Sequence, residues 1–152
     1  MCSMAFGKDP TPGITKISEL IFLIFGFGTI TEAKNTAQRF EKAKSLFLKK
    51  EWAKAKNLLL TVQNTAPGSI ESKRSRFLLG LIHMQNENFD SAIEVFKSLL
   101  KNYPEVEDYI LFNLAKTEFL NKKPDRAQKH LLKLLTRFPL SLIHISEPTR
   151  LG

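Results

Sequence analysis

Residues 87–104 read "ENFDSAIEVFKSLLKNYP", and the spacing of their side chains decides the fold. Ala92 stands near the centre, with Phe89 three residues before it and Pro104 twelve residues after it. Phe96 and Leu99 follow the alanine by four and seven residues. Apolar side chains at i, i+4 and i+7 lie on one face of a helix, and a proline does not extend a helix. The stretch therefore predicts an amphipathic helix that ends before Pro104.

Two more stretches repeat this pattern, "KEWAKAKNLLLTVQNTAP" at residues 50–67 and "KKPDRAQKHLLKLLTRFP" at residues 122–139. Ala55 and Ala127 are each followed twelve residues later by a proline. Alanine suits a position where two helices cross, because a larger side chain pushes the axes beyond the usual distance of about 8 to 10 Å. We therefore expect three equivalent helices, each packed closely against a neighbour.

A first helix is expected before each of these blocks, at residues 37–49, 73–85 and 108–121. A small residue again stands twelve positions before each key alanine. The spacings between the key alanines, 37 and 35 residues, are close to the length of about 34 residues of one repeat class of paired helices. We expect the six small residues to pack at the helix crossings: Ala43, Ala55, Gly80, Ala92, Ala115 and Ala127.

Residues 37–139 resemble three tetratricopeptide repeats, at 37–67, 74–104 and 109–139. The second repeat matches the family best, at Leu79 and Gly80 and in the pattern of residues 87–104. The first repeat departs from the family by having Arg39 where a bulky apolar residue is usual, and the third by having Pro124 at a helix start. A proline is tolerated in a first turn, whose amides lack intrahelical acceptors. The resemblance implies an all-α protein, an α-solenoid of three tetratricopeptide-like helix-turn-helix repeats.

The first 33 residues are interpreted as a leader that resembles an export signal. The apolar run at residues 20–30 is shorter than the roughly 20 residues of a membrane span but fits the core of a secretory signal. Thr31 and Ala33 would permit cleavage before Lys34. The leader predicts a periplasmic or cell-envelope protein with no transmembrane span in the mature chain. The alternatives are a buried helix or a disordered leader, a start codon further downstream, and a cytoplasmic protein.

The last residues, 140–152, do not continue the repeat pattern. The peptide "LSLIHISEPTR" that follows Pro139 resembles the translated read-through of a sequencing adapter. We interpret residues 140–152 as a non-native tail and expect the native solenoid to be truncated at Pro139. The alternative is a genuine coil or edge strand.

Composition favours one globular domain and gives little sign of a particular chemistry. The 152 residues carry a net charge of +8, but the basic side chains are spread along helices without a nucleic-acid-binding motif, so no nucleic-acid partner is predicted. The single cysteine, Cys2, excludes an intrachain disulfide. His83, His130 and His144 are scattered, and the chain has no metal-binding, nucleotide-binding or nucleophile motif. We therefore predict no cofactor, no metal and no catalytic residue in this fragment.

What remains is a binding surface. In tetratricopeptide arrays the first helix of each repeat lines the concave side, and this resemblance implies a protein or peptide ligand there. The alternative is that these side chains pack between neighbouring repeats. The matching positions are Phe40, Lys44, Phe47, Phe77, Leu81, Met84, Tyr109, Phe112, Lys116 and Phe119.

Residues 101–139 also resemble the helical region that precedes the catalytic domain of soluble lytic murein transglycosylases. This resemblance implies a periplasmic parent that cleaves peptidoglycan with a glutamate of a C-terminal domain. Glu71 and Ser72 echo the Glu-Ser signature of that family, but no glycine-rich motif follows, and we interpret Glu71 as an acid at a helix start. The sequence thus leaves two functions: a noncatalytic scaffold, or the accessory arm of a wall-cleaving enzyme with peptidoglycan as a partner.

Overall fold

A computed structural model describes residues 32–139 of the chain. The chain divides into two compact units, residues 1–35 and residues 36–152, and the helix stack belongs to the second. The predicted adapter-derived tail and nearly all of the predicted leader lie outside the described residues. The four described residues of the first unit, 32–35, are helical.

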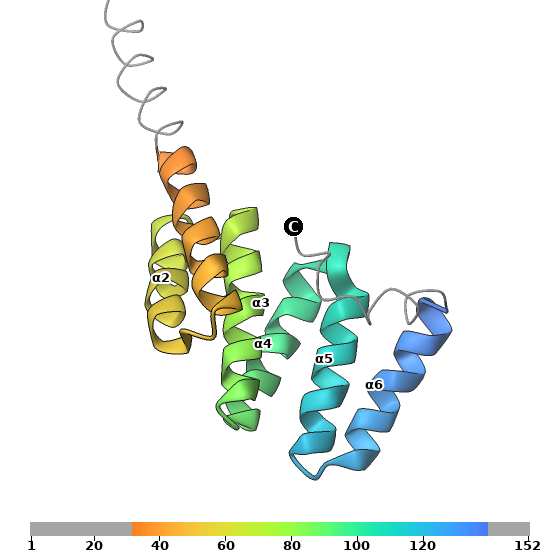
Figure 1. Ribbon diagram of the computed structural model, residues 1–152. Helices are drawn as coiled ribbons and strands as arrows, with labels where there is room; N and C mark the ends of the chain where they lie inside the picture. The colour runs from red at the N-terminus through yellow and green to blue at the C-terminus, as the bar shows by residue number, and fades with distance from the viewer. Residues whose placement is uncertain (1–31, 140–152) are drawn as a thin grey trace, which may run out of the picture. The chain divides into compact units, whose positions relative to one another are not determined.

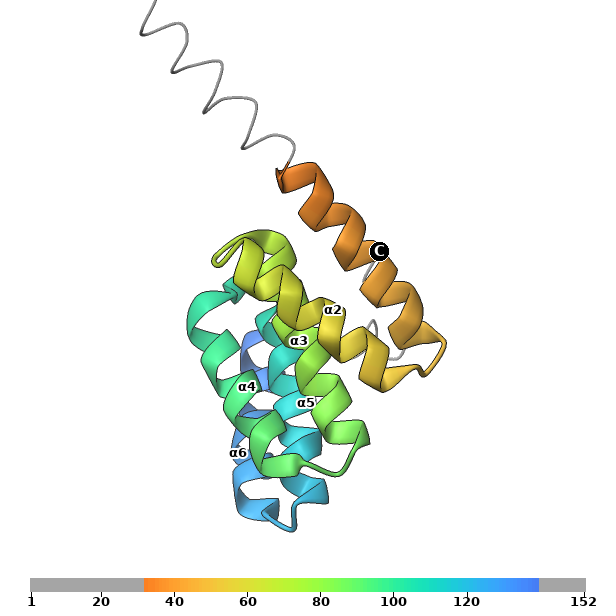
Figure 2. The same ribbon diagram turned by 90° about the vertical axis from the view of Figure 1, so that its left-hand side faces the viewer.

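Helices account for nearly all of the described residues. The first covers residues 32–48 and is followed by α2 (Trp52–Thr65), α3 (Ile70–Gln85), α4 (Phe89–Asn102), α5 (Glu107–Leu120) and α6 (Pro124–Arg137). A short 3-10 turn, η1 (Pro104–Val106), joins α4 to α5, and residues 32–139 contain no strand. Neighbours along the chain lie side by side and run in opposite directions (Figure 1, Figure 2). The prediction of an all-α solenoid of helix-turn-helix repeats is confirmed.

Two helix starts show how local chemistry sets the boundaries. Helix α3 begins at Ile70, three residues earlier than predicted, because the Ser69 hydroxyl accepts a hydrogen bond of 3.1 Å from the Ser72 amide and caps the helix. Glu71 lies in the first turn of that helix, where a negative charge complements the helix dipole. Helix α6 begins with Pro124 in its first turn. No helix among residues 32–139 is long and apolar enough to cross a bilayer.

The turn inside each helix pair has the same backbone at all three places. Lys50, Glu87 and Lys122 all adopt positive φ, between 56° and 62°. Each donates its amide to the carbonyl three residues earlier, and the next residue donates to the carbonyl five residues earlier. This is the Schellman ending, which usually has glycine at the left-handed position. The first helix pair therefore turns as the other two pairs do.

Gly80 allows a close crossing between α3 and α4. A methyl group added to Gly80 would lie 2.7 Å from the ring of Phe96, well inside van der Waals contact. The Phe96 ring is fully buried and meets Phe77 edge to face, with centroids 5.7 Å apart. The aromatic ring of α4 therefore occupies the space that the missing side chain leaves.

Two apolar clusters fill the interior of the helix stack. One joins the first helix and α2 to α3, and includes Phe40, Leu59 and Leu79. The other joins α3 and α4 to α5, and includes Phe77, Phe96 and Ile110. Both clusters cross from one helix pair to the next, so each pair completes its core with the first helix of the following pair.

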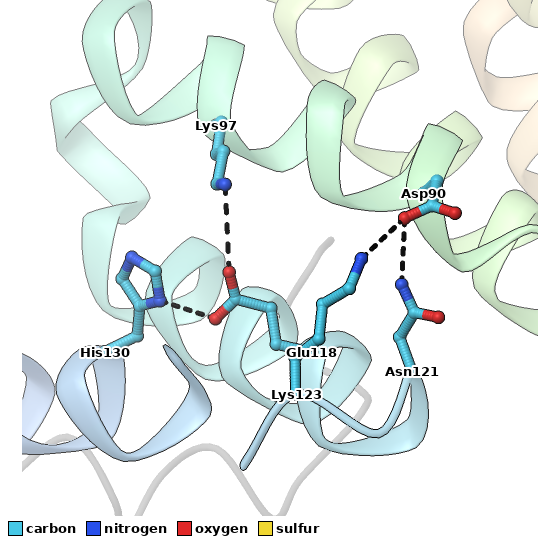
Figure 3. A network of polar contacts seen from close by, with 6 residues as sticks. All are labelled: Asp90, Lys97, Glu118, Asn121, Lys123 and His130. Atoms are coloured by element: carbon cyan, nitrogen blue, oxygen red, sulfur yellow. Dashed lines mark hydrogen bonds and ion pairs between the residues drawn. The ribbon is translucent and has the colours of Figure 1, made fainter. Parts of the chain in front are cut away.

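Two buried carboxylates tie α5 to its neighbours. Glu118 is fully buried, with one carboxylate oxygen 2.7 Å from Nδ1 of His130 on α6 and the other 3.8 Å from Nζ of Lys97 on α4 (Figure 3). Glu107, at the start of α5, pairs with Lys133 at 2.9 Å and with Arg137 at 2.5 Å. Both carboxylates therefore hold α6 against α5 through side chains that reach across the helix pair.

An exposed cluster ties α4 to the turn between α5 and α6. Asp90, at the start of α4, accepts hydrogen bonds of 2.8 Å from Lys123 and 2.9 Å from Asn121 (Figure 3). The hydrogen bond from Lys123, and next the one from Asn121, lower the pKa of Asp90 below its ordinary value.

Candidate functional site

A small apolar hollow lies where the first helices of three successive helix pairs, or the connections before them, come together. The first helix contributes Phe40 and Lys44, and α3 contributes Arg74, Phe77 and Leu78. The chain between α4 and α5 adds the last side chains of the lining, which are Tyr103, Val106 and, from the first turn of α5, Tyr109. We call these eight residues the aromatic groove.

The aromatic groove is small and mainly apolar. Its enclosed volume is about 30 Å³, room for roughly two waters at about 10 to 15 Å³ each. A typical small-molecule site has about 300 to 1,000 Å³. The groove is therefore the size of a notch for one side chain and is too small for a cofactor.

Cations surround the apolar floor of the groove. Lys44 and Arg74 are part of the lining, and Lys44 lies 3.7 Å from the Glu41 carboxylate. Next to the groove, the Lys73 ammonium lies 5.4 Å from the centroid of the Tyr103 ring, within the range of a cation–π contact. The Lys73 ammonium also lies 4.0 Å from the carboxylate of Glu105. The groove thus combines aromatic surface with positive charge.

The family model described as "Tetratricopeptide repeat" matches the chain twice, at residues 74–105 and 109–141. These two segments are similar to the tetratricopeptide repeat. Within the described range they correspond to the pairs α3–α4 and α5–α6. The first pair, the helix of residues 32–48 with α2, lies outside the matched segments but has the same turn between its helices. No curated protein matches the chain.

Tetratricopeptide repeats generally mediate protein binding and are generally noncatalytic. We call the three helix pairs repeats 1, 2 and 3.

Four of the ten predicted binding residues line the aromatic groove together: Phe40, Lys44, Phe77 and Tyr109. The rings of Phe40 and Phe77 are nevertheless almost completely buried, so each exposes little surface to the groove. The alternative expectation, that aromatic residues of the first helices pack between repeats, describes these two rings as well.

The other six predicted binding residues lie outside the groove lining. Met84 is buried beneath α5, where the Thr117 hydroxyl lies 3.3 Å from its sulfur atom, and Leu81 packs beside it. Phe47 packs against Trp52 with ring centroids 5.1 Å apart. The last three belong to α5: Phe112 is half-buried, whereas Lys116 and Phe119 are exposed.

Half of the groove lining was missed by sequence reasoning. Arg74 lies one turn before the predicted Phe77, so the spacing of a helix face could have included it, whereas Leu78 directly follows Phe77 and falls outside that spacing. Tyr103 and Val106 come from the connection between repeats 2 and 3, whose path the helical spacing does not specify. The proline after Tyr103 was the available signal, since it forces the chain to turn there.

The six small residues predicted for the helix crossings are all buried. Gly80 meets the Phe96 ring directly. Ala55 and Ala92 are fully buried within the two apolar clusters.

Chemically reactive groups do not gather near the groove. Within residues 32–139 no group of three His, Cys, Asp or Glu side chains could hold a metal ion. Partial burial, and next the charge of Lys56, lower the pKa of His83 below its ordinary value of 6.5, so this side chain stays neutral near pH 7. The pair of Glu118 and His130 lies inside repeat 3, between helices and outside the groove lining.

Proposed function

We propose that this protein is a noncatalytic scaffold that binds an extended segment of a partner protein along its first helices, with the aromatic groove as the anchor point. The single observation that carries this proposal is the aromatic groove itself. Residues from the first helices of three successive repeats, and from the connection before α5, line one apolar hollow that has Lys44, Lys73 and Arg74 beside it. Such a notch fits one apolar or aromatic side chain of the partner, and the cations favour acidic residues beside that anchor.

A selection from random peptides tests the proposal and requires no named partner. A library of 12-residue peptides would be selected on the immobilised full chain, and single peptides would then be titrated by fluorescence anisotropy. We expect sequences with an aromatic or large aliphatic residue next to Asp or Glu, with dissociation constants of about 1 to 100 µM, typical of a short segment with one anchor.

Two charge reversals separate the groove from the general positive charge of the chain. Arg74→Glu, in the groove, should weaken binding about tenfold, the equivalent of about 1.4 kcal/mol. Arg126→Glu removes an exposed cation of α6 outside the groove and should change binding much less. Equal losses in the two variants, or peptides without a shared pattern, would contradict the proposal.

We place the scaffold in the bacterial cell envelope, because residues 1–33 resemble an export signal. In a bacterial host, the mature protein should appear in the periplasmic fraction, and its first residue by terminal sequencing should be Lys34. Retention of the whole chain in the cytoplasmic fraction would contradict this location.

The alternative function, an accessory arm of a murein-cleaving enzyme, is supported only by the resemblance of residues 101–139. It predicts that the full chain sediments with purified murein sacculi and that the Arg74→Glu substitution releases it. If the chain stays in the supernatant at physiological salt, the arm function is excluded for this fragment. In either case we expect no hydrolysis of murein by the pure protein.

A further inference from the structure

A polar cleft lies at the end of repeat 2 where α3 begins and α4 ends. The two helices pack against each other in opposite directions, so these two ends come together (Figure 1). The volume of the cleft is about 320 Å³, at the lower end of the range of about 300 to 1,000 Å³ for small-molecule sites. We call the five lining residues the polar cleft: Gly68, Ser72, Lys73, Arg76 and Asn102.

The polar cleft offers hydrogen-bond donors and positive charge. Each of its four polar side chains can donate a hydrogen bond, and none of them carries a negative charge. The Asn102 amide nitrogen donates to the Ser98 carbonyl at 3.1 Å, which leaves its second hydrogen for another acceptor. The cleft therefore favours an anionic ligand with several oxygen atoms.

Ser72 is a buried polar residue of the lining whose hydroxyl lacks a partner. The residue is only 2% exposed, and its hydroxyl makes no hydrogen bond with any other residue of the range 32–139. Only its amide is used locally, as the donor to the Ser69 cap. Buried polar side chains nearly always have a hydrogen-bond partner. An acceptor bound in the cleft would supply the partner of this hydroxyl.

The two cations of the cleft are available to a ligand. The Arg76 guanidinium is half-buried and pairs with no acidic side chain among residues 32–139. The Lys73 ammonium lies 4.0 Å from the carboxylate of Glu105, which is exposed, and a surface pair at this distance is weak. Two positive charges thus remain beside the cleft with little compensation.

The first turn of α3 adds a favourable dipole. Amides in the first turn of a helix lack intrahelical acceptors, and the positive end of the helix dipole attracts anions. Gly68, just before this turn, has a φ of 86°, and a methyl group added to it would meet no other atom within 4 Å. The backbone that precedes α3 therefore borders open space, and an anion can approach it closely.

We propose that the polar cleft is a binding site for a phosphate group. A phosphate dianion matches the two charges of Lys73 and Arg76, and its oxygens can accept hydrogen bonds from the guanidinium, the ammonium and the Ser72 hydroxyl. A carboxylate has one charge and two oxygens, so it would leave donors unused. A small phosphate ester and a phosphorylated side chain of a partner present the same group.

The test is a nuclear magnetic resonance titration of the full chain at constant ionic strength and pH 8, where phosphate is mainly dianionic. Inorganic phosphate should give saturable shifts of the amides of residues 68–76, with a dissociation constant of about 0.1 to 10 mM. Acetate should bind at least about fivefold more weakly, because it uses fewer donors. Tighter binding of glycerol phosphate than of inorganic phosphate would assign a small ester, and tighter binding of a phosphoserine peptide would assign a partner's side chain.

Two variants that each remove one positive charge separate the cleft from the general charge of the chain. Arg76→Gln should weaken phosphate binding at least about tenfold. Arg126→Gln, at an exposed residue of α6 outside the cleft, should leave it unchanged. Ser72→Ala removes only the unpartnered hydroxyl and should weaken binding about threefold or more, and circular dichroism would show that all three variants fold.

Four results would overturn the proposal: shifts that spread over the exposed lysines without saturation, equal affinities for phosphate and acetate, equal losses in the two arginine variants, or unchanged binding by Ser72→Ala. The first three would show only a general attraction to a chain of net charge +8. The polar cleft shares no lining residue with the aromatic groove, so these outcomes are independent of the proposed peptide binding.

Discussion

The buried pair of Glu118 and His130 allows a quantitative test of the internal symmetry. Repeat 1 has leucines at the two corresponding positions, Leu46 and Leu58, and both pack against its apolar cluster. The double substitution Glu118→Leu with His130→Leu therefore gives repeat 3 the crossing that repeat 1 already has. Replacing a buried ion pair by packed apolar residues is often neutral or stabilising. We expect the free energy of unfolding of the double variant to lie within about 1 kcal/mol of that of the parent, or to exceed it.

The single substitution His130→Leu should behave very differently. It leaves the fully buried carboxylate of Glu118 with Lys97, 3.8 Å away, as its remaining partner in the described range. Loss of one partner of a buried pair costs about 3 to 5 kcal/mol. The His130 side chain is 24% exposed and Lys97 remains, so we take the lower end, about 3 kcal/mol.

Urea unfolding followed by circular dichroism measures these differences. With a slope of about 1.5 kcal/mol per M, a loss of about 3 kcal/mol lowers the midpoint by about 2 M. Repeat arrays can open from one end, so hydrogen exchange of the α6 amides serves as a local readout. A midpoint that His130→Leu lowers by less than about 0.5 M, or that the second substitution does not restore, would refute a buried, unpaired carboxylate as the cause.

Three further predictions concern the backbone and pH. Gly80→Ala should lower the free energy of unfolding, measured in urea, by about 1 to 2 kcal/mol. Overpacking against Phe96 costs about 1 to 3 kcal/mol, and the higher helix propensity of alanine recovers only about 0.5 to 1 kcal/mol. A variant more stable than the parent would show that the Phe96 ring can move away. Lys122→Gly should raise the free energy of unfolding by about 0.5 to 1 kcal/mol, because glycine adopts the positive φ of this residue without strain. The control Lys123→Gly, at a residue with negative φ, should lower the free energy of unfolding. Equal effects of the two substitutions would argue against backbone strain at Lys122. Because the pKa of His83 is lowered in the folded chain, the unfolded chain binds a proton at this side chain more readily. His83 therefore contributes stability above pH 6.5 that is lost as the pH falls through its folded pKa. His83→Leu should make the urea midpoint depend less on pH between 7 and 5, and an unchanged dependence would contradict this cause.

Helix positions could be predicted from the sequence because each helix face repeats the same spacing. Phe96 and Leu99 follow Ala92 by one and two turns and are fully buried, as are Leu59 and Val62 of α2. In α6 only the second of the two positions, Leu134, is fully buried. The start of α3 was placed three residues late, because Ser69 caps the helix with one hydroxyl and the helical spacing does not extend to it. Caps depend on single polar groups and are less visible in a sequence than a repeated face.

The candidate site was only half predictable, for a different reason. Positions on a helix face can be counted along the chain, and this counting found Phe40 and Phe77. Tyr103 and Val106 reach the same groove from a connection whose path depends on how two repeats pack. Counting also cannot tell a covered position from an open one. Phe40 and Phe112 have the same place in their repeats, but only Phe40 lies beneath a following helix within the described range.

The polar crossing of repeat 3 also bears on how the chain avoids misfolding. Each second helix must find its own first helix among three candidates with similar faces, and neighbouring repeats with near-identical sequences are prone to exchange partners. If α6 paired with the first helix of repeat 1, His130 would face Leu46, and Glu118 would be left opposite Leu58 with its charge unmatched. We therefore expect the Glu118 carboxylate to disfavour this incorrect pairing during folding. Its removal should leave the native state intact while the yield of correctly paired monomer after rapid refolding declines.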